Sequence, residues 1–170
     1  MTVDEQKISN ILAELSLTDK ANVVTGHGMW TTSIIGDAGI PALTVTDGPN
    51  GARGAGLMGT GTPTACIPAG SVLGSTWNPT LMEELGVLLA EESIAKGAHV
   101  LLAPTINLHR NPLGGRNFEC YSEDPYLTGT LAAGYINGVQ SQHVAVTAKH
   151  FVANDSEFER NSIDSQVDER

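Results

Sequence analysis

Short apolar segments alternate with helix-length segments along this chain, and this order constrains the fold more than any other feature. Residues 42–46, 100–103 and 144–148 are rich in β-branched and aliphatic side chains and predict short strands. Residues 79–96 and 125–142 predict the helices that separate them. Strands that alternate with helices of this length predict a parallel sheet, and therefore an α/β fold.

Local signals indicate where the helices begin. Asn78 and Asp124 each precede a proline, which is typical of an N-cap followed by the first helical residue. Nearer the N-terminus, apolar side chains recur at helical spacing and predict an amphipathic helix over residues 4–15. Thr18 is the expected N-cap of a second, shorter helix that ends before Gly26.

The polar clusters of the sequence follow the predicted strands at their C-terminal ends. Both (β/α) barrels and doubly wound sheets carry their active sites at this edge, so either architecture fits. Three strands are few for such a sheet, and the residues after Asp155 are polar and show no periodic pattern. We therefore expect the chain to be the front part of a larger fold.

Composition argues against several functions. The chain has 170 residues, a net charge of −10 and only nine Lys plus Arg, whereas nucleic-acid binding needs a basic face. No apolar run approaches the roughly 18 residues that span a bilayer. The acidic N-terminus does not resemble a secretory signal, so a cytoplasmic protein is expected. Cys66 and Cys120 form neither a disulfide framework nor a zinc-binding CxxC pattern, and neither a metal site nor a cofactor is predicted.

Residues 54–59 match the glycine pattern GxGxxG of dinucleotide-binding loops. That function needs a helix N-terminus directly after the loop to hold the pyrophosphate. Residues 60–63 read Thr-Gly-Thr-Pro and cannot open a helix at once, so a flexible loop is the better interpretation. An α/β binding module that uses this loop as its site remains an alternative.

Candidate site residues occur after each predicted strand. Asp47 follows the first strand, with Arg53 six positions later, and is either a turn residue or a carboxylate aimed into a cleft. Arg116 lies in a loop rich in carboxylates, where a surface ion pair with Glu119 is the simpler interpretation. Arg160 belongs to a charged stretch that is ordinarily a solvated surface.

Lys149 and His150 end the third predicted strand. A lysine at the end of an apolar strand is costly to desolvate unless it has a partner or a function. Neighbouring strand residues point to opposite faces, so both side chains can enter one cleft only if the backbone turns sharply. His150 taken alone is more simply a core histidine, but the pair together favours a functional site.

Three motifs in this order resemble the N-terminal domain of glycoside hydrolase family 3, of the β-glucosidase type. They are DGPNGAR at 47–53, GRNFECYSEDPYL at 115–127 and KHFVANDSEFER at 149–160. The predicted helix at 4–15, followed by Leu-Thr-Asp-Lys, is also similar to the start of that family. The resemblance covers nearly all of the 170 residues.

The resemblance implies a retaining, exo-acting glycosidase that acts on the non-reducing terminal sugar of a β-glucoside or oligosaccharide. It implies that residues 1–170 are the N-terminal portion of a TIM-like (β/α)8 barrel, incomplete in this chain, with no second domain. By motif position, Asp47 accepts hydrogen bonds from sugar hydroxyls, and the same substrate subsite is lined by Arg53, Arg116, Lys149, His150 and Arg160. It also implies non-proline cis peptide bonds near Lys149-His150.

The sequence departs from the family pattern in the catalytic residues. The nucleophile motif, typically Ser-Asp-Trp, does not occur in these 170 residues, and the acid/base usually comes from a second domain. KHFVAND replaces the KHFPGHG of the β-N-acetylglucosaminidase branch, which disfavours that branch. We therefore expect that this chain contains no catalytic carboxylate and that the isolated chain has no activity. We also expect that it needs a C-terminal part, and that the absence of this part favours oligomers or aggregation. A non-catalytic or truncated carbohydrate-binding fragment is the alternative.

Overall fold

The computed structural model describes residues 4–54 and 63–169, which form two compact units divided after Val45. The first unit contains the helices α1 (Glu5–Glu14) and α2 (Leu17–Val24) and the short 3-10 helix η1 (Gly36–Ala38). The predicted N-cap at Thr18 is wrong. Ser16 caps α2 instead, because its hydroxyl and the carboxylate of Asp19 satisfy each other's backbone N–H groups in a capping box.

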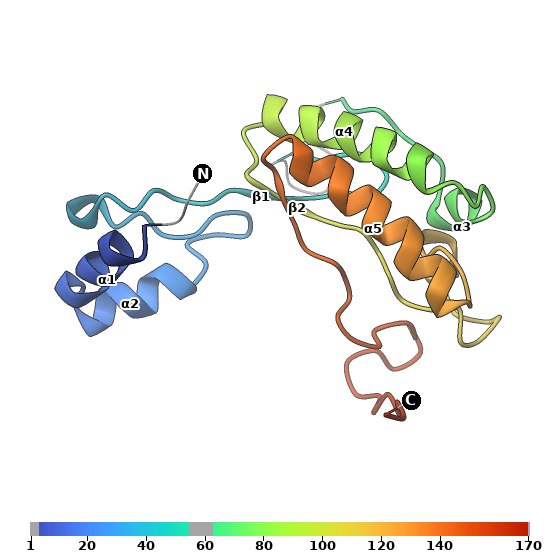
Figure 1. Ribbon diagram of the computed structural model, residues 1–170. Coiled ribbons are helices and arrows are strands. Elements are labelled where there is room, and N and C mark those ends of the chain that lie inside the picture. The colour runs from blue at the N-terminus through green and yellow to red at the C-terminus, as the bar shows by residue number, and fades with distance from the viewer. Residues whose placement is uncertain (1–3, 55–62, 170) are drawn as a thin grey trace. The chain divides into compact units, whose positions relative to one another are not determined.

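The second unit is an α/β structure, as the sequence predicts (Figure 1). Its sheet has the order β1-β2-β3, and β2 and β3 run parallel, with Leu101 opposite Val146. The strands are shorter than predicted. The elements are β1 (Val45–Asp47), α3 (Gly70–Gly74), α4 (Pro79–Ala95), β2 (Val100–Leu102), η2 (Asn117–Glu119), α5 (Pro125–Ser141) and β3 (Ala145–Val146).

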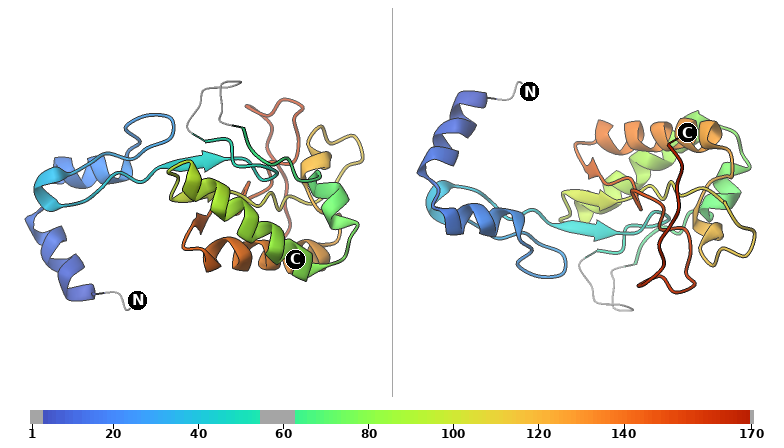
Figure 2. Two further views of the ribbon diagram at one scale, coloured as in Figure 1. Left: turned by 90° about the horizontal axis from the view of Figure 1, so that it is seen from above. Right: turned by 90° about the horizontal axis from the view of Figure 1, so that it is seen from below.

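Helices α4 and α5 lie side by side in all views (Figures 1 and 2). The predicted N-caps are confirmed: Asn78 accepts from the backbone N–H of Leu81, and Asp124 accepts from that of Tyr126. The helices approach so closely that a Cβ on Gly138 would lie 2.0 Å from the carbonyl oxygen of Glu83. This contact requires glycine at that position.

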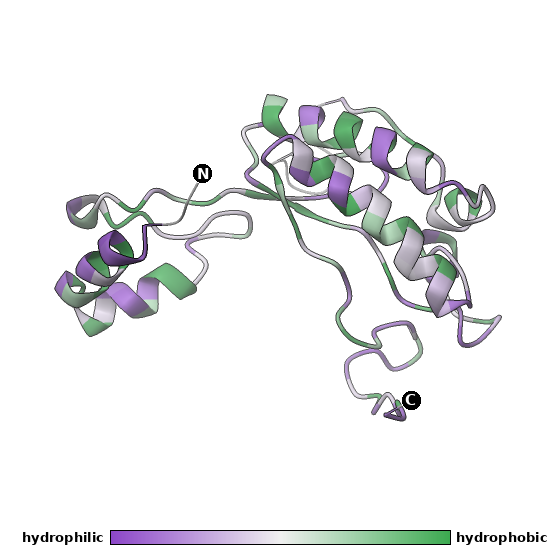
Figure 3. Ribbon diagram, viewed as in Figure 1, coloured by the Kyte–Doolittle hydropathy of each residue, from purple (hydrophilic) through white to green (hydrophobic). Residues whose placement is uncertain are grey.

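Apolar side chains of α4, α5 and the strands form the core of the second unit. Hydrophilic and hydrophobic residues alternate along both helices (Figure 3). Tyr135 is completely buried, and its hydroxyl donates to the carbonyl oxygen of Pro49 at 3.1 Å. This bond ties α5 to the segment that follows Asp47. The other fully buried large side chains include Met82, Leu89, Leu101, Leu131 and Val139.

The C-terminal ends of the strands supply the candidate site, as expected. Asp47 is the last residue of β1, and the chain beyond β3 stays beside the chain beyond β2 through a parallel bridge between Thr105 and Lys149. The Lys149–His150 and Phe151–Val152 peptide bonds are cis, which confirms the expectation for this region. Among the described residues, none of the helices is long and apolar enough to cross a membrane.

Candidate active site

A carboxylate between two cations forms the first half of the site. Lys149 Nζ donates to Asp47 Oδ1 at 2.6 Å, and Arg53 Nη2 donates to Asp47 Oδ2 at 3.1 Å. The Lys149 side chain is 15% exposed and that of Arg53 is 43% exposed, so lysine is the more enclosed partner. Burial alone raises the pKa of Asp47, but the hydrogen bond and charge of Lys149, with the charge of Arg53, outweigh it and hold this pKa below its usual value.

Backbone pairing positions Lys149 for this contact. Its N–H donates to the carbonyl oxygen of Pro104, and its own carbonyl accepts from the N–H of Ile106. The strand direction of β3 is thereby continued to Lys149, whose side chain reaches Asp47 at the end of β1, on the other side of β2. The structure thus brings together Lys149 and Asp47, which the resemblance assigns to one subsite.

A guanidinium group organises the second half of the site. Arg116 Nε donates to Glu119 Oε1 through a short contact, and its Nη1 lies 3.6 Å from Glu157 Oε1. Arg116 Nη2 lies 3.0 Å from His150 Nε2. The side chains of Arg116 and Glu119 are 19% and 13% exposed, so their pair is not the surface ion pair that the sequence alone suggested.

His150 follows Lys149 directly in the chain and belongs to the second half of the site. Lys149 contacts Asp47 while the imidazole of His150 contacts Arg116, so these two adjacent residues contribute one side chain to each half. Burial lowers the pKa of His150, and the positive charges of Arg116 and Lys149 lower it further. The imidazole therefore favours its neutral form.

Arg160 is the least enclosed of the six predicted residues. Its Nη1 donates to Glu157 Oε2 at 3.1 Å, and its side chain is 48% exposed. It joins the cluster through Glu157, which Arg116 also approaches. The six predicted residues thus fall into two sets of contacts, one around Asp47 and one around Arg116, which the adjacent residues Lys149 and His150 join along the chain. The two sets together are called the site network, and Arg53 and Arg160 are its exposed members.

Sequence reasoning missed three side chains of this network. Glu119 is expected from the sequence only as a surface partner of Arg116, and Glu157 carries no signal beyond its charged stretch, yet both contact Arg116 within the site. Asn107 carried no motif signal at all, but it is only 7% exposed and binds His150.

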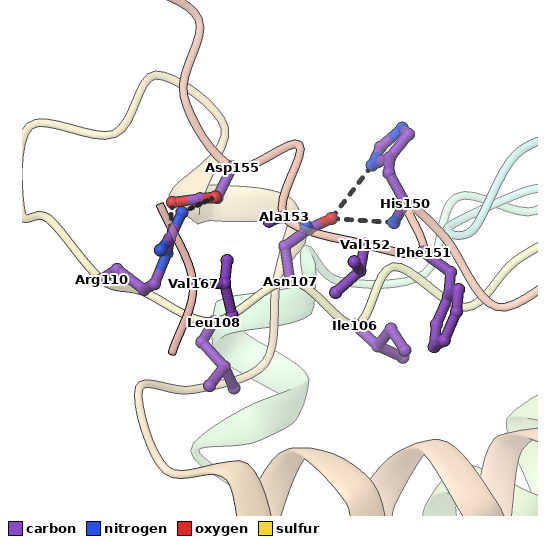
Figure 4. Close-up of a pocket in the computed structure, with 10 residues that line it drawn as sticks. All are labelled: Ile106, Asn107, Leu108, Arg110, His150, Phe151, Val152, Ala153, Asp155 and Val167. Carbon is purple, nitrogen blue, oxygen red and sulfur yellow. Dashed lines mark hydrogen bonds and ion pairs between the residues drawn. The ribbon is translucent and has the colours of Figure 1, made fainter. Parts of the chain in front are cut away.

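A cavity of about 130 Å³ adjoins the network on the side of His150 (Figure 4). Apolar side chains dominate its lining, including Ile106, Phe151 and Val152. At its rim Arg110 makes a two-bond ion pair with Asp155, at 3.0 and 2.7 Å. This pair fastens the loop after β2 to the segment after β3.

The described residues contain no group of three or more His, Cys, Asp or Glu arranged to hold a metal ion. The glycine pattern at 54–59 falls, apart from Gly54, outside the described residues. The site offers carboxylate acceptors, guanidinium and ammonium donors and a neutral imidazole within one cluster. This set of groups suits a neutral ligand with many hydroxyls, because each hydroxyl both donates and accepts.

Comparison with known proteins identifies the family. Residues 3–169 match the sequence model of the glycosyl hydrolase family 3 N terminal domain. The chain belongs to this family. It is 55% identical over 163 residues to a beta-glucosidase of Rhizobium radiobacter and 46% identical over 168 residues to beta-glucosidase B of Emericella nidulans. These alignments cover 96% and 99% of the chain, and 20% of each relative, so the chain spans about a fifth of their length.

Solved structures of beta-glucosidases are similar to this chain. The beta-glucosidase of Kluyveromyces marxianus, solved in complex with glucose, matches with a TM-score of 0.85 and 46% identity over 88% of this chain and 18% of its own. Beta-glucosidase 3B of Thermotoga neapolitana, also solved with glucose, matches with a TM-score of 0.80 and 40% identity. That match covers 89% of this chain and 24% of the Thermotoga protein.

Proposed function

We propose that this chain supplies most of a glucose-binding subsite in a β-glucosidase. The observation that carries the proposal is the enclosed Asp47 carboxylate, held by Lys149 in the same network as Arg116 and His150. A carboxylate between cations accepts hydroxyl hydrogen bonds, and the guanidinium and imidazole groups offer partners to neighbouring hydroxyls. The glucose bound in structures of related proteins supports glucose as the sugar.

We further propose that residues 1–170 are the N-terminal portion of a (β/α)8 barrel in a retaining, exo-acting enzyme. The parallel pairing of β2 and β3 and the similarity to solved beta-glucosidases support this architecture. Retention requires two carboxyl groups about 5–5.5 Å apart, one as nucleophile and one as acid/base. Asp47 and Glu119 are each committed to a cation, so we assign binding roles to this chain and the nucleophile to a part of the enzyme beyond it.

Glucose binding to the purified chain tests the first proposal directly. Isothermal titration should show saturable binding of glucose, and Asp47→Asn should weaken it about tenfold or more, because each charge-assisted hydrogen bond contributes about 1.5–3 kcal/mol. Glu91→Gln is the matched control, since Glu91 is an exposed carboxylate on α4 and is not one of the six predicted site residues. Equal affinities of the two variants would assign Asp47 to a merely structural role.

Kinetics test the second proposal. In an enzyme that contains this chain together with its nucleophile, Asp47→Ala should lower kcat/KM by about 100-fold or more and lower kcat as well, because some of its bonds tighten in the transition state. The 170-residue chain alone should not hydrolyse a chromogenic β-glucoside. Hydrolysis by the chain that survives repurification and is abolished by Glu119→Gln would move the nucleophile into this chain.

A further inference from the structure

Asn107 makes two contacts with His150 through one oxygen atom. The backbone N–H of His150 donates to Asn107 Oδ1 at 2.9 Å, and the ring atom Nδ1 lies 3.0 Å from the same oxygen (Figure 4). On the opposite edge of the ring, Nε2 lies 3.0 Å from Arg116 Nη2. Both ring nitrogens of His150 therefore have one partner each.

The chemistry of the partners fixes the position of the imidazole proton. A backbone N–H only donates, so the side-chain atom of Asn107 that receives it is the carbonyl oxygen and not the amide nitrogen. That oxygen accepts from Nδ1 too, which must therefore carry a hydrogen. A guanidinium group also only donates, so Nε2 must offer Arg116 a lone pair.

We propose that Asn107 is a positioning residue of the sugar subsite that fixes His150 as the neutral tautomer protonated on Nδ1, so that Nε2 accepts from Arg116 and sets the orientation of the guanidinium. Glu119 binds the Nε edge of Arg116, and His150 binds the Nη2 group. Glu157 lies 3.6 Å from Nη1, so groups on three sides hold the plane of the guanidinium that would bind a ligand. The inference rests on the proposed function and assigns to Asn107 a role in it.

Protonation of His150 would break this arrangement. An imidazolium carries a hydrogen on Nε2, which would point at the donor groups of Arg116. The charged groups that act on the imidazole are Arg116, Lys149 and Arg160, which oppose its protonation, and Glu119, which favours it. Burial acts in the same direction as the three cations, and the pKa of His150 lies below its usual value.

Nitrogen-15 NMR of the histidine rings tests the tautomer without any sugar. The chain contains five histidines, and loss of one ring signal set in His150→Gln assigns His150. At neutral pH the wild-type ring should show a protonated Nδ1 and an unprotonated Nε2. A wild-type ring protonated on Nε2 would overturn the proposal.

Two substitutions of Asn107 separate the effect of its acceptor atom from the effect of its packing. Asn107→Leu removes the acceptor, and the preference for the Nδ1-protonated tautomer should disappear. Asn107→Asp keeps the acceptor and adds a negative charge. This charge should favour the protonated form of His150 and lower its acid dissociation constant by about tenfold or more. Should Asn107→Leu fail to fold, the Asn107→Asp titration decides the question alone.

Asn111→Asp is the matched control for the added charge. Asn111 lies in the same loop, is exposed, and accepts from the backbone N–H of Leu113, which a carboxylate does equally well. The titration of His150 should remain close to wild type in this variant. Equal shifts of the His150 titration in Asn111→Asp and Asn107→Asp would refute a direct role of Asn107.

Glucose affinity measured against pH connects the tautomer to binding. The wild-type affinity should fall as the pH drops through the His150 titration, and Asn107→Asp should lose affinity at a higher pH, in step with its own titration. A glucose affinity that does not change with pH across the His150 titration would overturn the positioning role of Asn107. A wild-type chain with the expected tautomer that binds no glucose at any pH would instead refute the proposed function.

Discussion

The ion pair between Asp47 and Lys149 should contribute measurably to the stability of the fold. We consider Lys149→Met, which keeps the length of the side chain and removes its charge. Loss of one partner from a fully buried pair costs about 3–5 kcal/mol, whereas an exposed pair contributes about 0–1 kcal/mol. The two side chains are 15% and 23% exposed, and Arg53 remains beside Asp47, so we expect a loss of about 2 kcal/mol.

Urea unfolding of the chain measures this effect, with Arg53→Met as the matched control. The Arg53 side chain is 43% exposed and contacts the same carboxylate at 3.1 Å, so its replacement should cost less than about 1 kcal/mol. The variant pair Asp47→Asn and Lys149→Met, combined in a double-mutant cycle, isolates the coupling between the two side chains. Equal losses for Lys149→Met and Arg53→Met would refute the reasoning from burial.

The pH dependence of the same measurement has a defined sign. The pKa of Asp47 is lower in the folded chain than its model-compound value of 3.8, so folding favours the ionised carboxylate. This contribution to stability is complete above the unfolded-state pKa and is lost as the pH falls through the folded-state pKa. The destabilisation by Lys149→Met should therefore be constant near neutral pH and shrink towards acid. A difference that stays constant into strong acid would show that the charge of Asp47 is not involved.

Two further predictions concern packing and reactivity. Gly138→Ala should destabilise the chain by about 2 kcal/mol or more in urea unfolding, because the new Cβ meets the backbone of α4, whereas Gly129→Ala, in the same helix with open space around it, should stabilise by up to about 1 kcal/mol. Iodoacetamide should label the exposed Cys66 in the native chain and leave Cys120 unlabelled until unfolding, because burial raises the pKa of the Cys120 thiol to about 11. Similar labelling rates would contradict this accessibility.

Local sequence signals predicted the helices well, because their ends are determined by nearby atoms. The Asn78-Pro79 and Asp124-Pro125 signatures place the starts of α4 and α5 at the observed residues. The strands are shorter than the apolar runs that predicted them, because pairing with a neighbouring strand, and not propensity, determines where a strand ends. Thr18 is not the N-cap because Ser16, two residues earlier, forms a reciprocal pair of hydrogen bonds with Asp19.

The charged residues of the site could be predicted from the sequence, but the buried Asn107 could not. Asp47 and Lys149 are 102 positions apart, but Asp47 ends β1 and Lys149 follows β3, and β2 lies between these two strands in one sheet. Asn107 has no such signal, because an asparagine in a loop is ordinarily exposed, and only the fold shows that its oxygen lies between the backbone and the ring of His150. Resemblance to a family supplied the roles of the motif residues and could not supply this one.

Burial, together with the balance of charge around it, lowers the pKa of His150 and favours its neutral form. The chain as a whole is strongly acidic, with a net charge of −10. Around His150 the balance is reversed, since the cationic groups that act on it outnumber the carboxylates. A second hydrogen on the ring would add another cation to a partly buried cluster and face a guanidinium that has no lone pair to receive it. Because Arg116 cannot accept a hydrogen from Nε2, this atom stays unprotonated and accepts from Arg116 instead. The neutral ring and the ordered guanidinium are therefore two consequences of one arrangement.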